Sequence, residues 1–214
     1  LDQAGQAVSG GDFNGDGFAD AAVGAFFADP AGGESGSGYI VYGRAPTTVA
    51  NRIGSAAGQY MSGGIKAETL SALAGGDELE GRKGPDKLKG GIGKDAASYR
   101  HAPLGLTADL LNPGNNTRDA TGDTYESIES LIGTEFADDL SGDNLANVLT
   151  GGKGLDRLTG RLGSDVFRFT RVSDSPPSGR DRINDFDAGS AATTVDRIDL
   201  SAIDGRNNGT DNDA

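Results

Sequence analysis

Residues 133–169 read GTEFADDLS, GDNLANVLT, GGKGLDRLT and GRLGSDVFR, a series of four nonapeptides that each begin with glycine, followed by Phe169. The sixth position holds Asp138, Asn147, Asp156 and Asp165, and the eighth holds Leu140, Leu149, Leu158 and Phe167. A strict nine-residue period indicates stacked repeats, each of which contributes one small structural unit to a shared core.

The residue types of the nonapeptide predict one strand and one turn per unit. The residues around the eighth position are expected to form a short strand whose large apolar side chain points inward. The glycine-rich half is expected to turn, because glycine reaches positive φ and lets backbone carbonyls face a common point. Since Ca²⁺ takes roughly six to eight oxygen ligands, carbonyls and one carboxylate suit it. A flexible linker is the alternative, but a linker would not keep an apolar residue at every ninth position.

Two strands and two turns per coil would place turns that are two units apart on the same side. Calcium ions are therefore predicted between the turns that begin at Gly133 and Gly151, and between those that begin at Gly142 and Gly160. The turns at Gly151 and Gly160 keep the most glycines, so Asp156 and Asp165 are the strongest candidate ligands.

A second array with the same register occupies residues 63–98, which read GGIKAETLS, ALAGGDELE, GRKGPDKLK and GGIGKDAAS. Its sixth positions hold Glu68, Asp77, Asp86 and Asp95, of which the three aspartates are expected to be the better ligands. Lysine and arginine residues crowd these turns and would oppose a cation. A coil that binds one ion or none is therefore the alternative for this array.

The candidate ligands in the two arrays are sixth-position side chains and, in four turns, the first and third residues as well. They are Asp77, Gly81, Lys83, Asp86, Gly90, Ile92, Asp95, Asp138, Asn147, Gly151, Lys153, Asp156, Gly160, Leu162 and Asp165.

A different calcium motif lies near the N-terminus, where residues 10–25 read GGDFNGDGFADAAVGA. The spacing D-x-N-x-D-G-x-x-D resembles the start of an EF-hand loop, although Val23 stands where an EF-hand has its bidentate glutamate. The predicted ligands are Asp12, Asn14, Asp16, Phe18 through its carbonyl, and Asp20. Glycine-broken apolar stretches flank the motif and predict strands rather than long helices. An Asx-rich turn without metal is the alternative.

Composition restricts the classes of partner. The chain has a net charge of −13, which argues against nucleic acid and anionic membranes. It has no cysteine, so a metal rather than a disulfide is the expected cross-link. No apolar run is long enough for a membrane span, and residues 1–3 do not resemble the start of a signal peptide.

The organisation predicted from these patterns is all-β, with a parallel β-roll in two arrays and an N-terminal unit like a propeller blade. The expected divisions are 1–60 for the blade-like unit, 61–98 for the first array, 99–132 for a connector and 133–169 for the second array. Residues 170–214 are expected to supply capping strands and a polar tail. The stretch 125–132 could be a short strand or one helical turn.

The N-terminal unit resembles an FG-GAP repeat, the blade of the integrin α-subunit propeller, through GGDFNGDGFAD, AVGA and the closing GYIVYG. The nonapeptides resemble RTX, or hemolysin-type, calcium-binding repeats. With VFRF, RDRINDFDAG and DRIDLSAIDG, residues 63–204 resemble the C-terminal domain of serralysin-type secreted metalloproteases. The resemblance implies a calcium-bound roll and export from a Gram-negative bacterium by a type I secretion apparatus.

No catalytic constellation is found. One histidine cannot supply H-E-x-x-H, and neither G-x-S-x-G nor a P-loop is present. We therefore expect a secreted, calcium-binding RTX module that folds on calcium binding outside the cell and supports export and stability of a larger protein. The alternatives are the non-catalytic C-terminal part of a secreted serralysin-like metallopeptidase or other hydrolase, and an adhesin or surface-assembly protein with a cell-surface or self-association partner.

Overall fold

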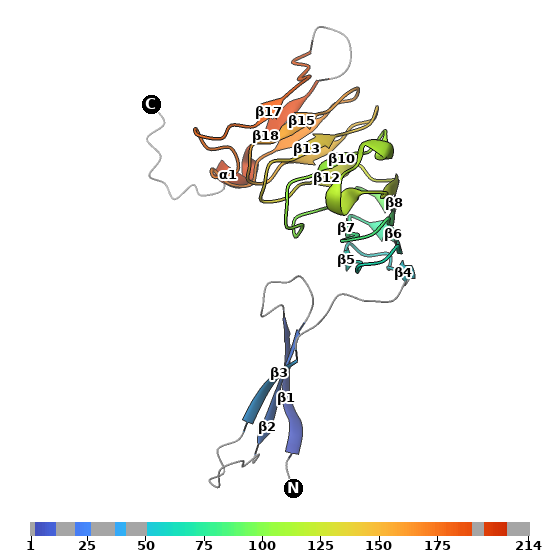
Figure 1. Cartoon of the computed structure of the whole chain (residues 1–214), viewed down its shortest axis with the longest axis vertical. Coiled ribbons are helices and arrows are strands. Elements are labelled where there is room, and N and C mark those ends of the chain that lie inside the picture. The colour runs from blue at the N-terminus through green and yellow to red at the C-terminus, as the bar shows by residue number, and fades with distance from the viewer. Residues whose placement is uncertain (1–2, 12–19, 27–36, 42–50, 190–194, 205–214) are drawn as a thin grey trace. The chain divides into compact units, whose positions relative to one another are not determined.

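A computed structural model describes residues 3–11, 20–26, 37–41, 51–189 and 195–204 (Figure 1). The chain divides into two compact units, Leu1–Pro46 and Thr47–Ala214. Each unit is described by itself below.

The N-terminal unit is a three-stranded antiparallel sheet in the order β1-β2-β3. Its strands are β1 (Gln3–Gly11), β2 (Asp20–Phe26) and β3 (Ser37–Val41). Glycine and small residues run through all three, and a register irregularity interrupts the β1–β2 ladder between Ala4 and Ala7. The strands predicted around the calcium motif and at its closing segment are confirmed, as is the blade-like character of the unit.

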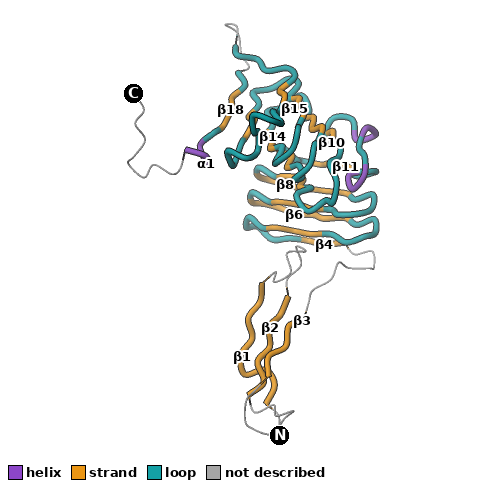
Figure 2. Tube along the Cα trace, turned by 60° about the vertical axis from the view of Figure 1, so that its left-hand side comes forward, coloured by secondary structure: helices purple, strands orange, loops and turns teal. Residues whose placement is uncertain are grey.

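The C-terminal unit is a roll of parallel strands in which the chain alternates between two faces (Figures 1 and 2). One face is a single seven-stranded sheet, the long sheet. In stacking order its strands are β5 (Tyr60–Ser62), β7 (Glu78–Glu80), β9 (Ala96–Ser98), β12 (Ser130–Ile132), β14 (Val148–Thr150), β16 (Val166–Arg168) and β18 (Arg197–Asp199).

The other face consists of two four-stranded parallel sheets. The first contains β4 (Asn51–Ile53), β6 (Thr69–Gly75), β8 (Lys87–Gly93) and β11 (Thr124–Glu126). The second contains β10 (Thr107–Asp109), β13 (Asp139–Ser141), β15 (Arg157–Thr159) and β17 (Arg182–Ile183). The long sheet continues past the division between them, so both arrays belong to one roll. The all-β parallel roll predicted from the nonapeptides is confirmed.

The eighth-position side chains form the core. The strand registers pair Leu70 with Leu88 and Leu140 with Leu158, which stacks equivalent residues 18 positions apart. The fully buried residues at this position are Leu70, Leu79, Leu88, Ala97, Leu140, Leu149, Leu158 and Phe167, each with 0% of its surface exposed. Because they form one apolar cluster along the roll, hydrophobic burial stabilises the two arrays together.

The connector fills the gap between the arrays with strands that are out of sequence order. After β9 the chain forms β10, which pairs with β13, and then returns to form β11, which pairs with β8. The stretch 125–132 forms β11 and β12 rather than a helical turn. The hydroxyl of Tyr99, which is fully buried, lies 2.9 Å from an oxygen of Asp123 and 2.6 Å from the Tyr125 hydroxyl, and this network holds the connector inside the roll.

The first coil begins earlier than the sequence patterns suggested. Residues 51–62 form β4 and β5, which pair with β6 and β7, although residues 51–60 were expected to belong to the blade-like unit. Residues 54–62 read GSAAGQYMS, a worn nonapeptide with Gln59 at the sixth position and buried Met61 at the eighth. The unit lacks the aspartate at its sixth position and the glycines at its second and fourth positions, so the sequence pattern alone does not identify it as a repeat.

The C-terminal segment continues the stack through β17 and β18. Its side chains are less buried than expected, because they lie at the open end of the core: Ile198 is 46% exposed and Phe186 is 41% exposed. The only α-helix among the described residues is α1 (Ser201–Asp204), and no helix in this part of the chain is long and apolar enough to cross a membrane.

Candidate metal centre

The sixth-position side chains form two ladders, one along each side of the roll where the chain turns. In each ladder a carboxylate oxygen accepts the backbone N–H of the sixth-position residue in the turn below. The N–H of Asp77 donates to Asp95 Oδ1 at 2.8 Å, and the N–H of Asp138 donates to Asp156 Oδ1 at 2.9 Å. The same contact joins Glu68 to Asp86 and Asn147 to Asp165. The acids predicted to be ligands are therefore brought into register, one coil above another.

Five turns leave the second oxygen of this acid without a partner, and we call them open turns. Their second residue is in the left-handed region, with φ of 79° at Leu73, 71° at Arg82, 105° at Gly91, 92° at Gly152 and 74° at Arg161. Their acids are Asp77, Asp86, Asp95, Asp156 and Asp165, and each has a buried Oδ2 with no hydrogen-bond partner among the described residues. A buried, unpaired carboxylate oxygen costs free energy unless a cation or a proton meets it.

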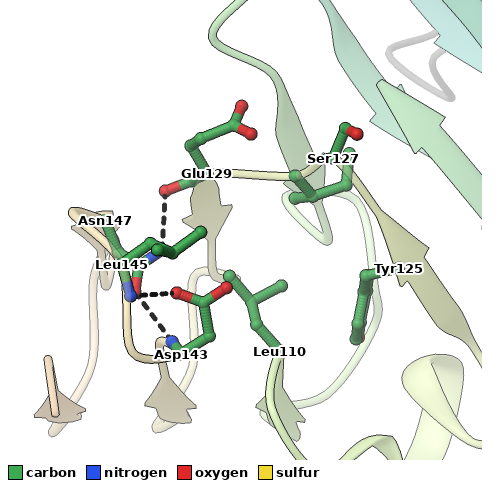
Figure 3. Close-up of a pocket in the computed structure, with 8 residues that line it drawn as sticks. Leu110, Tyr125, Ser127, Glu129, Asp143, Leu145 and Asn147 are labelled. Atoms are coloured by element: carbon green, nitrogen blue, oxygen red, sulfur yellow. Dashed lines mark hydrogen bonds between the residues drawn. The ribbon is translucent and has the colours of Figure 1, made fainter. Parts of the chain in front are cut away.

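Two turns of the second array satisfy the same side chain internally, and we call them closed turns. In the first, Thr134 donates its N–H to Asp138 Oδ2 at 2.6 Å and its hydroxyl to the same oxygen at 3.0 Å. In the second, the Asp143 N–H donates to Asn147 Oδ1 at 2.7 Å. Figure 3 shows this second turn beside a pocket of about 270 Å³, in which the Asn147 amide also reaches the Glu129 carbonyl at 3.4 Å.

The turn that begins at Gly63 combines features of both kinds. Its Gly64 N–H donates to Glu68 Oε2 at 2.7 Å, as in a closed turn. The other oxygen, Oε1, is buried without a partner among the described residues. Glu68 is therefore partly satisfied by its own turn, which supports the expectation that it is a weaker ligand than the aspartates.

Glycine is required where the turns approach one another. A Cβ on Gly154, whose φ is 138°, would lie 2.6 Å from the Phe136 carbonyl oxygen in the turn below. The fourth-position glycines Gly84, Gly93 and Gly163 meet the carbonyls of Lys66, Gly75 and Leu145 in the same way. Carbonyl oxygens of the lower turn thus face the fourth residue of the turn above, in the same turns that hold unpartnered carboxylates. This donor set of neutral carbonyls and few acids suits Ca²⁺.

Burial makes the charged form of these acids unfavourable. It raises the pKa of Asp86 to about 8, that of Asp156 to about 7, and that of Asp165 to about 6, against an ordinary value of 3.8. Burial also raises the pKa of Asp138 to about 6, where the hydrogen bonds from Thr134 oppose the effect. A bound cation would favour the charged forms and reverse these shifts.

The remaining predicted ligands lie in the same turns. The opening glycines Gly81, Gly90, Gly151 and Gly160 each face the aspartate five residues later so closely that no Cβ would fit. At the third position the side chains point outward: Ile92 is 79% exposed, Leu162 is 67% exposed, and the Lys153 ammonium pairs with Glu135. The Lys83 N–H donates to the Gly64 carbonyl at 3.1 Å.

In the N-terminal motif, Asp12, Asn14, Asp16 and Phe18 lie outside the described residues, and Asp20 is the first residue of β2. Among all the described residues, those of the two arrays included, no group of three or more histidine, cysteine, aspartate or glutamate side chains could hold a metal. A metal site in the roll would therefore depend on backbone carbonyls.

Four acids that extend the ladders were not predicted from the sequence. Asp123 and Glu129 in the connector accept the N–H groups of Asp86 and Asp95 at 2.8 and 2.9 Å. Asp181 and Asp196 in the C-terminal segment accept those of Asp156 and Asp165 at 3.0 and 2.9 Å. Each is followed two residues later by an apolar or aromatic residue, as in the nonapeptide, but without the glycine-rich turn. That acid-x-apolar pair is the signal that could have found them.

Comparison with known families bears out the three resemblances. Residues 132–211 match the serralysin C-terminal domain of peptidase M10, residues 4–41 match the FG-GAP repeat, and residues 62–96 match the RTX calcium-binding nonapeptide repeat in four copies. No curated protein matches the chain. The matched regions are non-catalytic repeat and C-terminal modules, so the roll is a calcium-binding module of a kind found in secreted proteins.

Proposed function

We propose that the C-terminal unit is a folding switch that orders when calcium binds between its stacked turns. The observation that carries this proposal is the set of open turns, each with a left-handed second residue and a buried, unpartnered aspartate oxygen. In such a turn the described residues supply a donor for one carboxylate oxygen, Oδ1, and none for the other, Oδ2. A cation is the partner that the carbonyl-lined space can accept.

Two pairs of stacked acids are the best-supported places for an ion. Asp77 and Asp95 belong to two open turns, one above the other, and both have unpartnered oxygens. Asp156, in an open turn, and Asp181 above it, which has no glycine-rich turn, also both have unpartnered oxygens. Calcium bound at these positions would neutralise carboxylates that the fold buries close together.

Without calcium, the charged form of the roll is disfavoured by buried like charges and by the entropy of ordering glycine-rich turns. With calcium, binding free energy becomes folding free energy. Extracellular modules bind calcium at roughly 10⁻⁴–10⁻³ M, so such a chain stays unfolded in a calcium-poor cytosol. This behaviour suits passage through a type I secretion apparatus in unfolded form and folding outside the cell.

A calcium titration followed by far-UV circular dichroism tests the switch. The expected result is a β signal that grows with calcium and is absent in excess EGTA. A matched pair of variants locates the effect: Asp156→Asn removes charge from an open turn, and Asp138→Asn removes it from the closed turn beneath. Asp156→Asn is expected to weaken calcium affinity by about tenfold or more, equivalent to about 1.4 kcal/mol, and Asp138→Asn by much less.

Two results would contradict the proposal. One is a full β signal in EGTA, because the roll would then need no ion. The other is an equal loss of affinity in both variants, because the unpartnered oxygen would then have no special role.

A second candidate concerns the protein to which the roll belongs. The match of residues 132–211 to a serralysin C-terminal domain favours the non-catalytic end of a secreted metallopeptidase. The FG-GAP match of residues 4–41 favours an adhesin or surface-assembly protein instead. The gene sequence upstream of Leu1 distinguishes them, since H-E-x-x-H would select the peptidase and further blades would select the adhesin.

A further inference from the structure

The space between the turns at Gly142 and Gly160, where a calcium ion was predicted, contains a positively charged side chain. Arg161, the second residue of the upper turn, donates from Nη1 to the Gly142 carbonyl of the lower turn. The same guanidinium forms two hydrogen bonds with the Asp109 carboxylate, from Nη1 at 2.7 Å and from Nη2 at 2.8 Å. One side chain therefore links both turns to β10 of the connector.

The ion pair is well shielded from solvent. The Asp109 side chain is 4% exposed and that of Arg161 is 22% exposed. Burial opposes the charged form of Asp109, but the hydrogen bonds from Arg161, Asn112 and Asn115 outweigh it and lower the pKa of this carboxyl. The bond to Asp109 in turn raises the pKa of Arg161. A two-pronged, buried pair of this kind holds its position better than an exposed one.

Apart from Asp165 Oδ2, which has no partner among the described residues, this turn pair offers few ligands. Asn147 replaces the aspartate of the lower turn, and its Oδ1 already accepts the Asp143 N–H. In the upper turn, the N–H groups of Gly160 and Arg161 donate to the two oxygens of Asp185 at 2.9 and 2.8 Å. The neighbouring pair at Gly133 and Gly151 differs at the decisive position, where Gly152 has no side chain to enter the space.

We propose that the Arg161 guanidinium takes the place of a calcium ion between the turns at Gly142 and Gly160. It uses a carbonyl that a cation would need, and its charge repels a second cation from the same space. The arginine thereby closes this position to calcium and fastens the connector to the second array without a metal. This inference rests on the proposed function, since it assumes that other turn pairs bind calcium.

The test is to open the position and count ions. The double variant Arg161→Gly/Asn147→Asp removes the guanidinium, restores glycine at a left-handed residue and supplies the missing carboxylate. Arg82→Gly is the matched control, because Arg82 has the same place in its turn and a φ of 71°, but its Nε faces Ser62 at 3.2 Å and Glu80 at 3.4 Å. Native mass spectrometry and isothermal titration calorimetry in saturating calcium would count the bound ions.

The double variant is expected to bind one calcium ion more than the wild type, and Arg82→Gly the same number as the wild type. An unchanged number in a folded double variant would overturn the inference. A wild type that binds no calcium would instead contradict the proposed function, so the two failures are distinguishable.

A measurement on the wild type keeps the test decisive if the double variant fails to fold. Crystals of the wild type soaked in Tb³⁺ would give anomalous peaks at the calcium positions. The expected map has no peak between Gly142 and Gly160 and retains the guanidinium there. A peak at that position, with Arg161 displaced, would show that the arginine does not take the place of the ion.

Discussion

The turns at 133–138 and 151–156 are stacked in one ladder, yet they treat the same residue in opposite ways. Each has an aspartate at its sixth position and a fully buried leucine at its eighth. Asp138 is held by the N–H and hydroxyl of Thr134, whereas Asp156 keeps a buried oxygen without a partner among the described residues. The second residue makes the difference, since Gly152 is left-handed and Thr134 is not among the residues with positive φ.

This difference separates two properties that the nonapeptide usually combines. The nine-residue spacing and the eighth-position leucine decide whether a coil forms. The second residue decides whether the acid is satisfied within its own turn or left for a cation. A turn can therefore keep its place in the roll after it has lost its value as a metal ligand.

The largest effect on stability is expected at the buried leucines that follow the two turns, where both turns should behave alike. Leu140→Ala and Leu158→Ala each remove a fully buried side chain, so each should lower the free energy of unfolding in saturating calcium by about 2–5 kcal/mol. Chemical denaturation checks this result. Leu155→Ala, at a residue that is 58% exposed, is the control and should change stability by less than about 0.5 kcal/mol. A large difference between the two core variants would mean that the turns also differ in their strands.

The next prediction concerns pH in calcium-free solution. Because burial raises the pKa of Asp86 to about 8, that of Asp156 to about 7 and that of Asp138 to about 6, the folded roll binds protons that the unfolded chain releases above about 3.8. These groups therefore favour the fold at acid pH, and their contribution is lost progressively as the pH rises from about 3.8 and is gone above the folded pKa values of about 6–8. The β signal in circular dichroism should be greater at pH 5 than at pH 8. Asp156→Asn should weaken this dependence more than Asp138→Asn does, and a signal that rises with pH would contradict the expectation.

A smaller effect is expected when the closed turn is opened. Thr134→Gly removes the hydroxyl that donates to Asp138 and lets the second residue become left-handed. The lost hydrogen bond is worth about 0.5–1.5 kcal/mol, and the variant should gain calcium affinity because the Asp138 oxygen is left for the ion. Thr134→Ser, which keeps the hydroxyl, is the control. Calorimetric titration that finds equal affinities for the two variants would show that Thr134 does not close the turn.

The smallest effect is expected at the third positions of the same two turns. The Lys153 ammonium pairs with Glu135 on the surface, where the two side chains are 44% and 49% exposed. Lys153→Met should change the free energy of unfolding by no more than about 1 kcal/mol and leave the number of bound ions unchanged. A lost ion would mean that the backbone of this residue depends on the side-chain pair.

Much of the roll could be predicted from the sequence, because the repeat encodes strand, turn and buried residue within nine positions. The seven leucine and phenylalanine side chains and the one alanine at the eighth position are buried as expected. The coil at 54–62 was missed because Gln59 and Ala57 replace the residues that mark the motif. The connector was incompletely predicted because β10 and β11 pair with strands on opposite sides of the gap, in an order that local patterns do not contain.

Local periodicity is enough to specify the fold class, the nine-residue register and the acids of the turns. Which of those acids remain without a partner depends on the tertiary structure. That outcome depends on contacts across 18 or more residues, such as Asp156 with Asp181, and on the left-handed backbone at the second residue. The tertiary structure also determines the position of the Arg161 guanidinium, whose partner Asp109 lies 52 residues earlier in the chain.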